Sequence, residues 1–244
     1  RLLTSGETKR IIACSNLVKN QIVQHYGVEP GRIAVIPNGV AFQEKNGPES
    51  MRTSLRKRWG IPGDDRVLLF VGNEFARKGL QTVLEAMARL AMPDVRLLVV
   101  GAGNIGPYER LTEALHLGGR VSFLGSVERP ERLFGIADIF IFPTLYDPCP
   151  LVVLEAMAAG VPVVTSRSCG TVEGMTHGLH GIYLDDPTSA GEAAEWIRTL
   201  LTDHKLHEQL SLEGRNKARE YCWDAIAART LEILEKVVPE KQNA

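Results

Sequence analysis

The sequence predicts a doubly wound α/β domain with a parallel, Rossmann-like sheet, and two observations lead to this fold class. Short apolar runs alternate with longer amphipathic stretches over most of the chain. The apolar runs are continuous rather than alternating, as in strands that are buried on both faces of a parallel sheet. Strands and helices that follow one another through short loops are the pattern of a doubly wound sheet.

Six apolar runs are expected to form the strands of this sheet, and four stretches between them to form helices. The strands are predicted at residues 67–71, 96–100, 121–124, 139–142, 162–165 and 181–184, and the helices at 80–90, 108–117, 130–136 and 151–159. In the first helix the apolar side chains recur with the spacing of one helical face. Ligands of such sheets bind beyond the carboxyl ends of the strands, so the loops that follow the strands are the places to search for chemistry.

The two ends of the chain are organised differently from its middle. Residues 10–15 and 32–36 are predicted strands with a helix between them, and the turn signal Pro37-Asn38-Gly39 follows. Residues 190–238 have a helical pattern with a break near Tyr221. We therefore expect three parts, which are residues 1–38, 39–220 and 221–244.

Composition and charge argue against several classes of protein. The 28 Lys and Arg residues balance 29 Asp and Glu residues, so no net field favours nucleic acid. No apolar run reaches the roughly 20 residues of a membrane helix, and residues 1–10 lack the apolar core of a signal peptide. The four cysteines show no C-x-x-C spacing, which predicts reduced thiols in a cytoplasmic protein and no metal site.

The loop after the first strand of the sheet carries two adjacent cations, Arg77 and Lys78, before Gly79 and a helix. A helix N-terminus offers free N–H groups, Arg can fork onto phosphate oxygens, and Lys acts as a compact charge. A solvated Arg-Lys pair is the plainer interpretation. The position at the carboxyl end of a strand favours a diphosphate site.

The loop after the second strand, Gly101 to Gly106, satisfies the pattern G-x-G-x-x-G. A dinucleotide site would need an acidic residue at the end of the next strand, about 20 positions later. That strand ends in Ser122-Phe123-Leu124-Gly125, which has no carboxylate. We therefore expect the backbone at Gly101 and Gly103 to approach another nucleotide, and an NAD-dependent oxidoreductase remains a third hypothesis.

Two carboxylates accompany the loop after the fourth strand. Asp147 lies in the proline-rich loop, and Glu155 lies inside the otherwise apolar helix that follows. Burying a charge is costly unless it is paired or hydrogen-bonded, and a ribose diol would supply such bonds. A solvent-facing Glu155 or an internal ion pair is the alternative.

Several longer motifs occur together and in order along the chain. They are IPNGV at residues 36–40, ARKG at 76–79, GAG at 101–103, the segment 125–137 and LVVLEAMAAGVPVV at 151–164. Residues 10–223 thereby resemble the retaining GT-B glycosyltransferases of family 4, and GNEFARKGL is similar to the lipopolysaccharide-core glucosyltransferases within that family. The resemblance implies that residues 39–220 form the C-terminal, nucleotide-sugar-binding domain of a GT-B fold. Residues 1–38 would be the tail of the acceptor-side domain, and residues 221–244 a helix that returns toward it.

The resemblance assigns roles to single residues. Arg77 and Lys78 match the cations that neutralise the donor diphosphate. In the family's E-x7-E motif the second acid, which binds the ribose hydroxyls, matches Glu155, and the first, which contacts the donor sugar, falls on Asp147.

Further positions follow from the same resemblance, with one departure. Backbone at Ser126 and Val127 would line the base, and Glu173 is a candidate for the donor sugar. Asp147 stands where the family has Glu, and Pro148-Cys149-Pro150 stands where the family more often has small residues with glycine. Proline has no N–H to donate, so the predicted donor-sugar loop keeps its N–H groups at Cys149 and Leu151, beside Pro150.

The resemblance thus implies transfer of a hexose, with retention, from a UDP-sugar to a glycan or lipid-linked glycan, without a metal or other cofactor. We expect the chain to supply the donor site in the cytoplasm and to transfer little on its own. A non-catalytic nucleotide-binding module is the alternative function. The basic cluster Arg52, Arg56, Lys57 and Arg58 is interpreted either as a solvated helix face or as a peripheral contact with anionic lipid.

Overall fold

The computed structural model describes residues 8–42 and 49–237 and contains two separate parallel sheets. The smaller sheet pairs β1 (Ile11–Ala13) with β2 (Ile33–Val35), and helix α1 (Asn16–Tyr26) connects them. We call residues 8–36 the N-terminal unit. It has a small core of its own, formed by Ile11, Ala13, Val28 and Ile33.

The larger sheet has six strands, all parallel, as the continuous apolar runs predict. They are β3 (Arg66–Val71), β4 (Val95–Val100), β5 (Val121–Gly125), β6 (Ile139–Ile141), β7 (Val163–Ser166) and β8 (Ile182–Leu184). Their order in the sheet is β5-β4-β3-β6-β7-β8. The predicted Rossmann-like, doubly wound fold is therefore confirmed.

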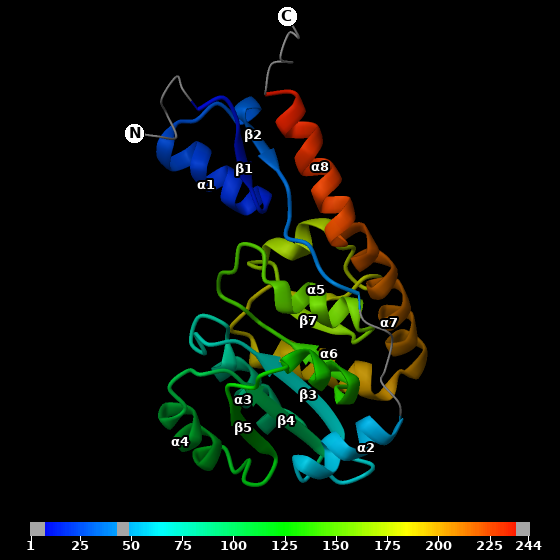
Figure 1. Ribbon diagram of the computed structural model, residues 1–244. Coiled ribbons are helices and arrows are strands. Elements are labelled where there is room, and N and C mark those ends of the chain that lie inside the picture. Colours follow the sequence, from blue (N-terminus) through cyan, green and yellow to red (C-terminus); the bar gives the residue numbers. More distant parts are fainter. Residues whose placement is uncertain (1–7, 43–48, 238–244) are drawn as a thin grey trace, which may run out of the picture.

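Helices cover both faces of this sheet (Figure 1). The α-helices are α2 (Glu49–Arg58), α3 (Leu80–Arg89), α4 (Gly106–Ala114), α5 (Leu151–Ala158), α6 (Ala190–Thr202), α7 (His204–Ala218) and α8 (Trp223–Glu235). Short 3-10 helices are η1 (Pro30–Arg32), η2 (Pro130–Ile136), η3 (Gly170–Gly174) and η4 (Arg219–Tyr221). The last helix, α8, runs back beside the N-terminal unit (Figure 1).

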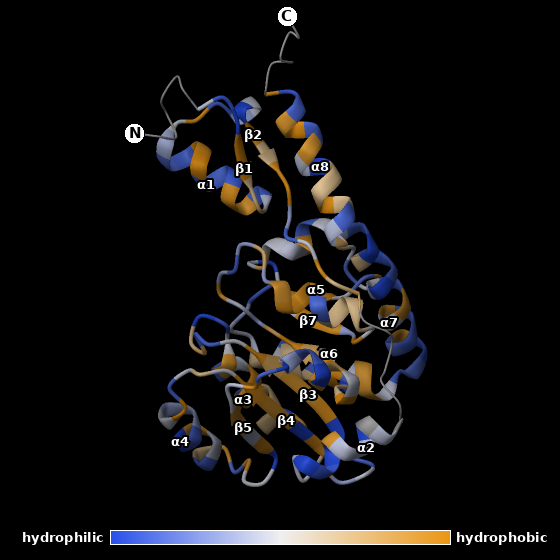
Figure 2. Ribbon diagram, viewed as in Figure 1, coloured by the Kyte–Doolittle hydropathy of each residue, from blue (hydrophilic) through white to orange (hydrophobic). Residues whose placement is uncertain are grey.

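The core of the larger part lies on the central strands and on the inner sides of their helices. Figure 2 shows β3 and β4 as hydrophobic beyond a hydrophilic residue near the start of each strand, and the outer helix α7 as largely hydrophilic. Phe142 follows β6, and its ring stacks on that of Phe140 at 5.9 Å and lies 6.0 Å from that of Phe70 on β3. These fully buried rings fix the ends of β3 and β6 against each other just below the loops that follow them.

The strand order reverses direction between β3 and β6. The chain winds outward from β3 through β4 to β5, returns to β6 on the other side of β3, and continues to β8. In sheets of this topology the loops that leave the two strands diverge to opposite faces, and ligands bind between them at the carboxyl edge. This topology brings the Arg77-Lys78 loop and the Asp147 loop together, although they are 69 residues apart.

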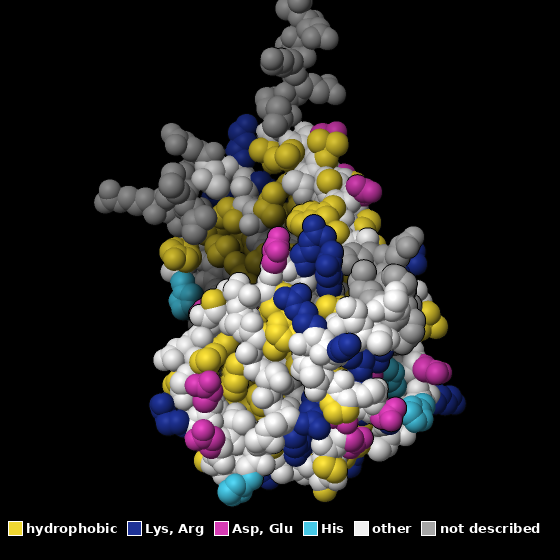
Figure 3. Space-filling model, turned by 60° about the horizontal axis from the view of Figure 1, so that its bottom comes forward, with side chains coloured by type: hydrophobic (Ala, Val, Ile, Leu, Met, Phe, Trp, Pro, Cys, Tyr) yellow, Lys and Arg dark blue, Asp and Glu magenta, His cyan; other side chains and the backbone are white. Residues whose placement is uncertain are grey.

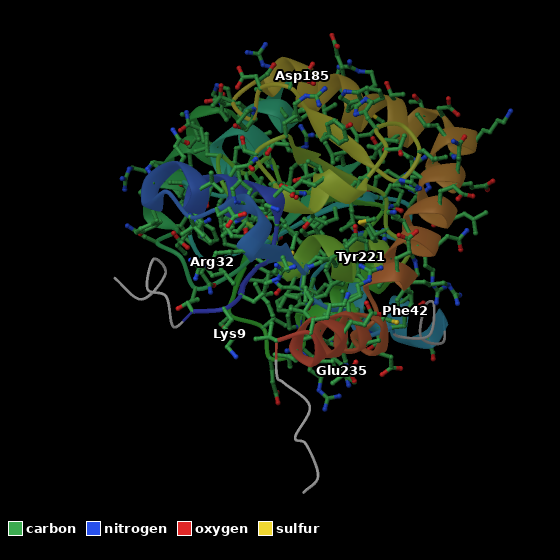
Figure 4. The ribbon with its side chains drawn as sticks, turned by 90° about the horizontal axis from the view of Figure 1, so that it is seen from above. Lys9, Arg32, Phe42, Asp185, Tyr221 and Glu235 are labelled. Atoms are coloured by element: carbon green, nitrogen blue, oxygen red, sulfur yellow. The ribbon has the colours of Figure 1, made fainter. Side chains whose placement is uncertain are left out.

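The chain crosses between the two sheets next to its own C-terminal helices. The Val40 N–H donates to the carbonyl of Tyr221 at 2.8 Å, and Arg219 lies over the ring of Phe42. Figure 4 shows Tyr221 and Phe42 beside these helices, with Lys9 near Glu235 at the far end of α8. Lys9 donates to the carbonyl of Val237 at 3.4 Å. The segment that follows α8 thus contacts the beginning of the described chain.

Three local expectations differ from the structure. The predicted helix at 130–136 is a 3-10 helix. The C-terminal helical region breaks at Asp203 as well as near Tyr221, because the Asp203 side chain accepts from Leu206 N at 3.0 Å and begins α7. The prediction of a solvated basic helix face is wrong for Arg56, because this side chain is buried and donates to the carbonyls of Pro62 and Asp65.

No described helix is long and apolar enough to cross a membrane.

Replacing Leu84 by Ala is expected to lower the free energy of unfolding by about 2–5 kcal/mol, because Leu84 is 0% exposed on α3 and its truncation leaves a cavity. Leu212→Ala on α7 is the matched control. Leu212 is 56% exposed, so its loss should change stability by no more than about 0.5 kcal/mol. Urea unfolding of the two variants tests this, and equal losses would contradict the assigned core.

Candidate functional site

The Arg77 side chain links the loops that follow β3 and β6. Its Nε and Nη2 donate to the Glu74 carboxylate at 2.9 and 2.5 Å, and its Nη1 donates to the carbonyl of Tyr146 at 2.6 Å. These hydrogen bonds lower the pKa of Glu74 and raise the pKa of Arg77, so both groups are charged near neutral pH. The Arg77 carbonyl accepts from the Leu145 N–H at 2.8 Å. The guanidinium is therefore oriented by neighbours and remains one-third exposed at the crevice.

Lys78 and Asp147 form a nearly buried ion pair between the same two loops. Their side chains are 12% and 11% exposed, and Lys78 Nζ donates to Asp147 Oδ2. The ammonium also lies 5.3 Å from the centre of the Phe142 ring, which favours the cation electrostatically. The fold thus brings together all three residues predicted for catalysis, Arg77, Lys78 and Asp147.

Helix α5 begins at the end of this loop, with Pro150 as its N-cap residue and Leu151 as its first residue. None of the described side chains caps its N-terminus. Its first N–H groups and the positive end of its dipole are therefore available to an anion at the crevice. Leu151 is exposed there, while Cys149 is buried and its carbonyl accepts from the Asn38 side chain at 2.8 Å.

Glu155 lies on α5 one turn beyond its start and is half-buried. It lines a cavity of about 150 Å³ with Glu131 and Phe134, on the side of α5 that faces η2. Burial raises the pKa of Glu155, and the charge of Glu131 adds to the effect. In the described part of the chain no hydrogen bond or ion pair joins Glu155 to Arg77 or Lys78. Its predicted role as the ribose ligand stays a prediction.

Gly101 and Gly103, the first two glycines of the G-x-G-x-x-G segment, are explained by packing against the loop after β3. Gly101 has φ +145°, and a Cβ atom there would overlap the carbonyl oxygen of Gly72. A Cβ atom at Gly103 would overlap the carbonyl oxygen of Asn73. The Asn73 side chain accepts from Ala102 N at 2.9 Å, so the two loops are joined directly. These positions need glycine for the approach of protein backbone, and their predicted contact with a nucleotide stays a prediction.

Ser126 and Val127 follow β5 at the same edge of the sheet. Val127 lines a cavity of about 420 Å³ with Trp59 and three arginines, which are Arg58, Arg129 and Arg132. Figure 3 shows Lys and Arg side chains gathered near the middle of the face that is turned forward. The predicted contact of Ser126 and Val127 with the base is not tested by these contacts.

Glu173 lies on η3, the turn after β7, and its observed partners belong to the N-terminal unit. Its carboxylate accepts from the backbone N–H groups of Asn16 and Leu17, both at 2.6 Å. It lines a cavity of about 160 Å³ with Cys149 and with residues of the N-terminal unit. Contact with the donor sugar stays a prediction for Glu173.

Glu74 and Tyr146, which hold the Arg77 guanidinium, were not among the predicted site residues. Glu74 had a signal, because it precedes Arg77 by three residues, a spacing that allows an ion pair within one turn. Tyr146 acts through its backbone carbonyl, which any residue has, so its identity gave no signal in the sequence. Within the described ranges no three His, Cys, Asp or Glu side chains gather as a ligand set for a metal ion. The four cysteines form no disulfide in the described ranges.

The comparisons with known proteins agree on one family. The protein-family model of the glycosyl transferases group 1 matches residues 51–217, and the family model of glycosyltransferase family 4 matches residues 1–44. The chain belongs to the glycosyl transferases group 1 family, and its fold is that of the GT-B glycosyltransferases. This confirms the resemblance seen in the motifs and excludes the hypothesis of an NAD-dependent oxidoreductase.

Two curated relatives show how much of such a protein the chain represents. It is 29% identical over 238 residues to the uncharacterized glycosyltransferase MJ1607 of Methanocaldococcus jannaschii, covering 95% of this chain and 61% of that one. It is 28% identical over 218 residues to the lipopolysaccharide glucosyltransferase WaaG of Escherichia coli, covering 87% and 58%. The chain thus spans about three-fifths of the length of these relatives.

Solved structures share the fold. The crystal structure of HepE of Anabaena in complex with UDP superposes with a TM-score of 0.87 at 24% identity, over 93% of this chain and 64% of that one. The complex of HepE with UDP-glucose gives a TM-score of 0.86.

Replacing Asp147 by Asn is expected to lower the free energy of unfolding by about 3 kcal/mol, because it leaves the Lys78 ammonium nearly buried without its carboxylate. Adding Lys78→Met should recover at least half of this loss, since no unpaired charge remains. Urea unfolding of both single variants and the double variant measures the coupling. Additive losses would show that the two groups do not interact.

Glu155→Gln is expected to raise the free energy of unfolding at neutral pH. A carboxyl whose pKa is raised in the folded state destabilises the fold when it is ionised, and this penalty disappears as the pH falls below the unfolded value. The advantage of Gln should therefore vanish below about pH 4.5, the ordinary value for Glu. Chemical unfolding across this range tests the sign, and a variant that is less stable at neutral pH would contradict the assignment.

Proposed function

We propose that this chain forms the nucleotide-sugar-binding site of a retaining glycosyltransferase that moves a hexose from a UDP-sugar to a glycan or lipid-linked acceptor. The observation that carries the proposal is the convergence of Arg77, Lys78 and the uncapped start of α5 at the switch point of the sheet. Two cations and a helix N-terminus are what a diphosphate requires.

The chemistry asked of these groups is electrostatic. When the bond between the anomeric carbon and the diphosphate breaks, negative charge grows on the leaving group, and preorganised donors stabilise it. Arg77 offers a guanidinium that is one-third exposed, and Lys78 offers an ammonium that Asp147 holds beside the start of the same loop. When the diphosphate attracts Lys78, Asp147 becomes available to a sugar hydroxyl. The site supplies this stabilisation from the chain's own cations, and the proposal includes no metal.

The spacing along α5 fits the rest of the nucleotide. Glu155 lies four residues beyond Leu151, about 6 Å along the helix at a rise of 1.5 Å per residue. A diphosphate at the start of α5 would thus leave the ribose within reach of Glu155, whose cavity is bordered by η2. The sugar hydroxyls of the ribose would supply hydrogen bonds to a carboxylate that now has a raised pKa.

A nucleotide-binding module without catalysis is the second candidate, because both cations are already paired with carboxylates and the chain spans three-fifths of its relatives. We propose that the acceptor is recognised by the remainder of the protein. The chain alone should bind UDP and transfer little sugar, whereas the whole protein should hydrolyse or transfer from the donor.

Arg77→Ala and Lys78→Ala should each weaken UDP binding to this chain by about tenfold to a hundredfold, the loss of a charged hydrogen bond. In the whole transferase each should lower turnover by about a hundredfold or more. Titration calorimetry with UDP, GDP, ADP and NAD measures binding and identifies the base. Lys205→Ala, which removes an exposed cation from α7, is the control. Undiminished UDP affinity in both site variants would refute the assignment.

A further inference from the structure

The beginning of helix α1 is capped by a carboxylate from the other part of the molecule. A helix leaves its first four N–H groups without intrahelical partners. Here Ser15 Oγ accepts from Val18 N at 3.3 Å, and the first turn contains no acidic residue of its own. Glu173, 157 residues away, accepts from Asn16 N and Leu17 N at 2.6 Å and from the Asn16 side chain at 3.1 Å. We call these three bonds the interdomain cap.

The turn that carries Glu173 is joined to the donor loop, which we define as residues 143–150. Gly170, at the start of η3, donates its N–H to the Asp147 carbonyl at 2.8 Å, and the Asp147 N–H donates to Ser168 at 3.1 Å. A Cβ atom at Gly170 would overlap the carbonyl oxygen of Pro148 and lie 2.9 Å from the Cβ of Ser15. The donor loop, η3 and the start of α1 are therefore packed in direct contact.

Two further hydrogen bonds connect the N-terminal unit and the segment that follows it to the donor loop. The Tyr146 hydroxyl donates to the Gln21 side chain on α1 at 2.7 Å, and the Asn38 side chain donates to the Cys149 carbonyl at 2.8 Å. Tyr146 is also the residue whose carbonyl accepts from Arg77. Tyr146 therefore connects helix α1 directly to Arg77, the predicted diphosphate ligand.

From these contacts we infer that Glu173 is a positioning residue: by capping α1 it holds the N-terminal unit on the donor loop and thereby orients Tyr146 and Arg77. The inference rests on the proposed function for the meaning of the donor loop. It gives Glu173 a role through the protein backbone, because both of its carboxylate oxygens accept from α1. The carboxylate also lies at the positive end of the α1 dipole, which adds to the attraction.

The test compares backbone amide exchange of Glu173→Ala with that of the unaltered chain, with and without UDP. Loss of a cap changes a local equilibrium by about fivefold to thirtyfold, so the amides of Asn16 and Leu17 should exchange faster by that factor. Glu173→Gln keeps one acceptor oxygen and should give an intermediate rate. Glu195→Ala, which removes an exposed carboxylate from α6, should leave both amides unchanged.

Ligand binding separates positioning from a structural role. UDP should slow exchange in α1 of the unaltered chain, because a ligand that orders Arg77 also orders Tyr146 and Gln21. In Glu173→Ala, the dissociation constant of UDP should change by no more than about threefold, because no direct contact with UDP is lost. UDP should, however, no longer slow exchange in α1 of this variant.

Two results would overturn the inference. Unchanged exchange at Asn16 and Leu17 in Glu173→Ala would show that no cap exists. Loss of binding of UDP, or of UDP-glucose with UDP binding retained, in a folded Glu173→Ala or Glu173→Gln would show that Glu173 contacts the donor itself. If UDP fails to bind even the unaltered chain, the proposed function fails, whereas the ligand-free exchange rates still decide whether the cap is present.

Discussion

The Lys78–Asp147 ion pair is the interaction on which the arrangement of the site depends. It joins the loops that leave β3 and β6, the two strands between which the order of the sheet reverses. Parallel strands alone would place these loops at one edge, but they would not fix their distance. An ammonium and a carboxylate with so little exposure cannot separate without leaving a buried charge unpaired, so each loop restrains the other. Arg77 repeats the connection with hydrogen bonds to Glu74 in its own loop and to Tyr146 across the crevice.

Both cations are therefore compensated before any ligand arrives, which shapes how an anion would bind. A free pair of adjacent cations would repel each other and move in solvent, whereas these two are held at the crevice by carboxylates. A diphosphate would replace Glu74 and Asp147 as the partner of the cations, so part of the attraction offsets the loss of existing pairs. What remains favourable comes from the start of α5, whose N–H groups have no side-chain cap. Preorganisation of this kind favours the charge that develops during reaction over the charge that is merely bound.

The sequence carried enough information for the sheet and for the loop cations, because both follow from local pattern and from the rule that parallel strands end at one edge. It carried less about contacts between distant residues. The partners of Glu173 lie in α1, and no spacing in the sequence connects positions 16 and 173. Arg56 is a second example. Its charge predicted exposure to solvent, but the side chain is buried and donates to two backbone carbonyls that the sequence does not identify. The break before α7 could have been found, since Asp203 precedes the helix as an N-cap residue.

The glycines of residues 101–106 show how a motif can be present for a reason other than its usual one. In a dinucleotide site such glycines let the backbone approach a pyrophosphate, whereas here Gly101 and Gly103 let it approach the loop of Gly72 and Asn73. That packing fixes the loop after β3 from the side opposite to the donor loop, so the segment that carries Arg77 and Lys78 is supported on both flanks. Glycine is needed at both positions because backbone meets backbone there, whether or not a nucleotide also approaches. The predicted diphosphate cations thus lie on a loop that is held by backbone packing on one side and by the Lys78–Asp147 pair on the other.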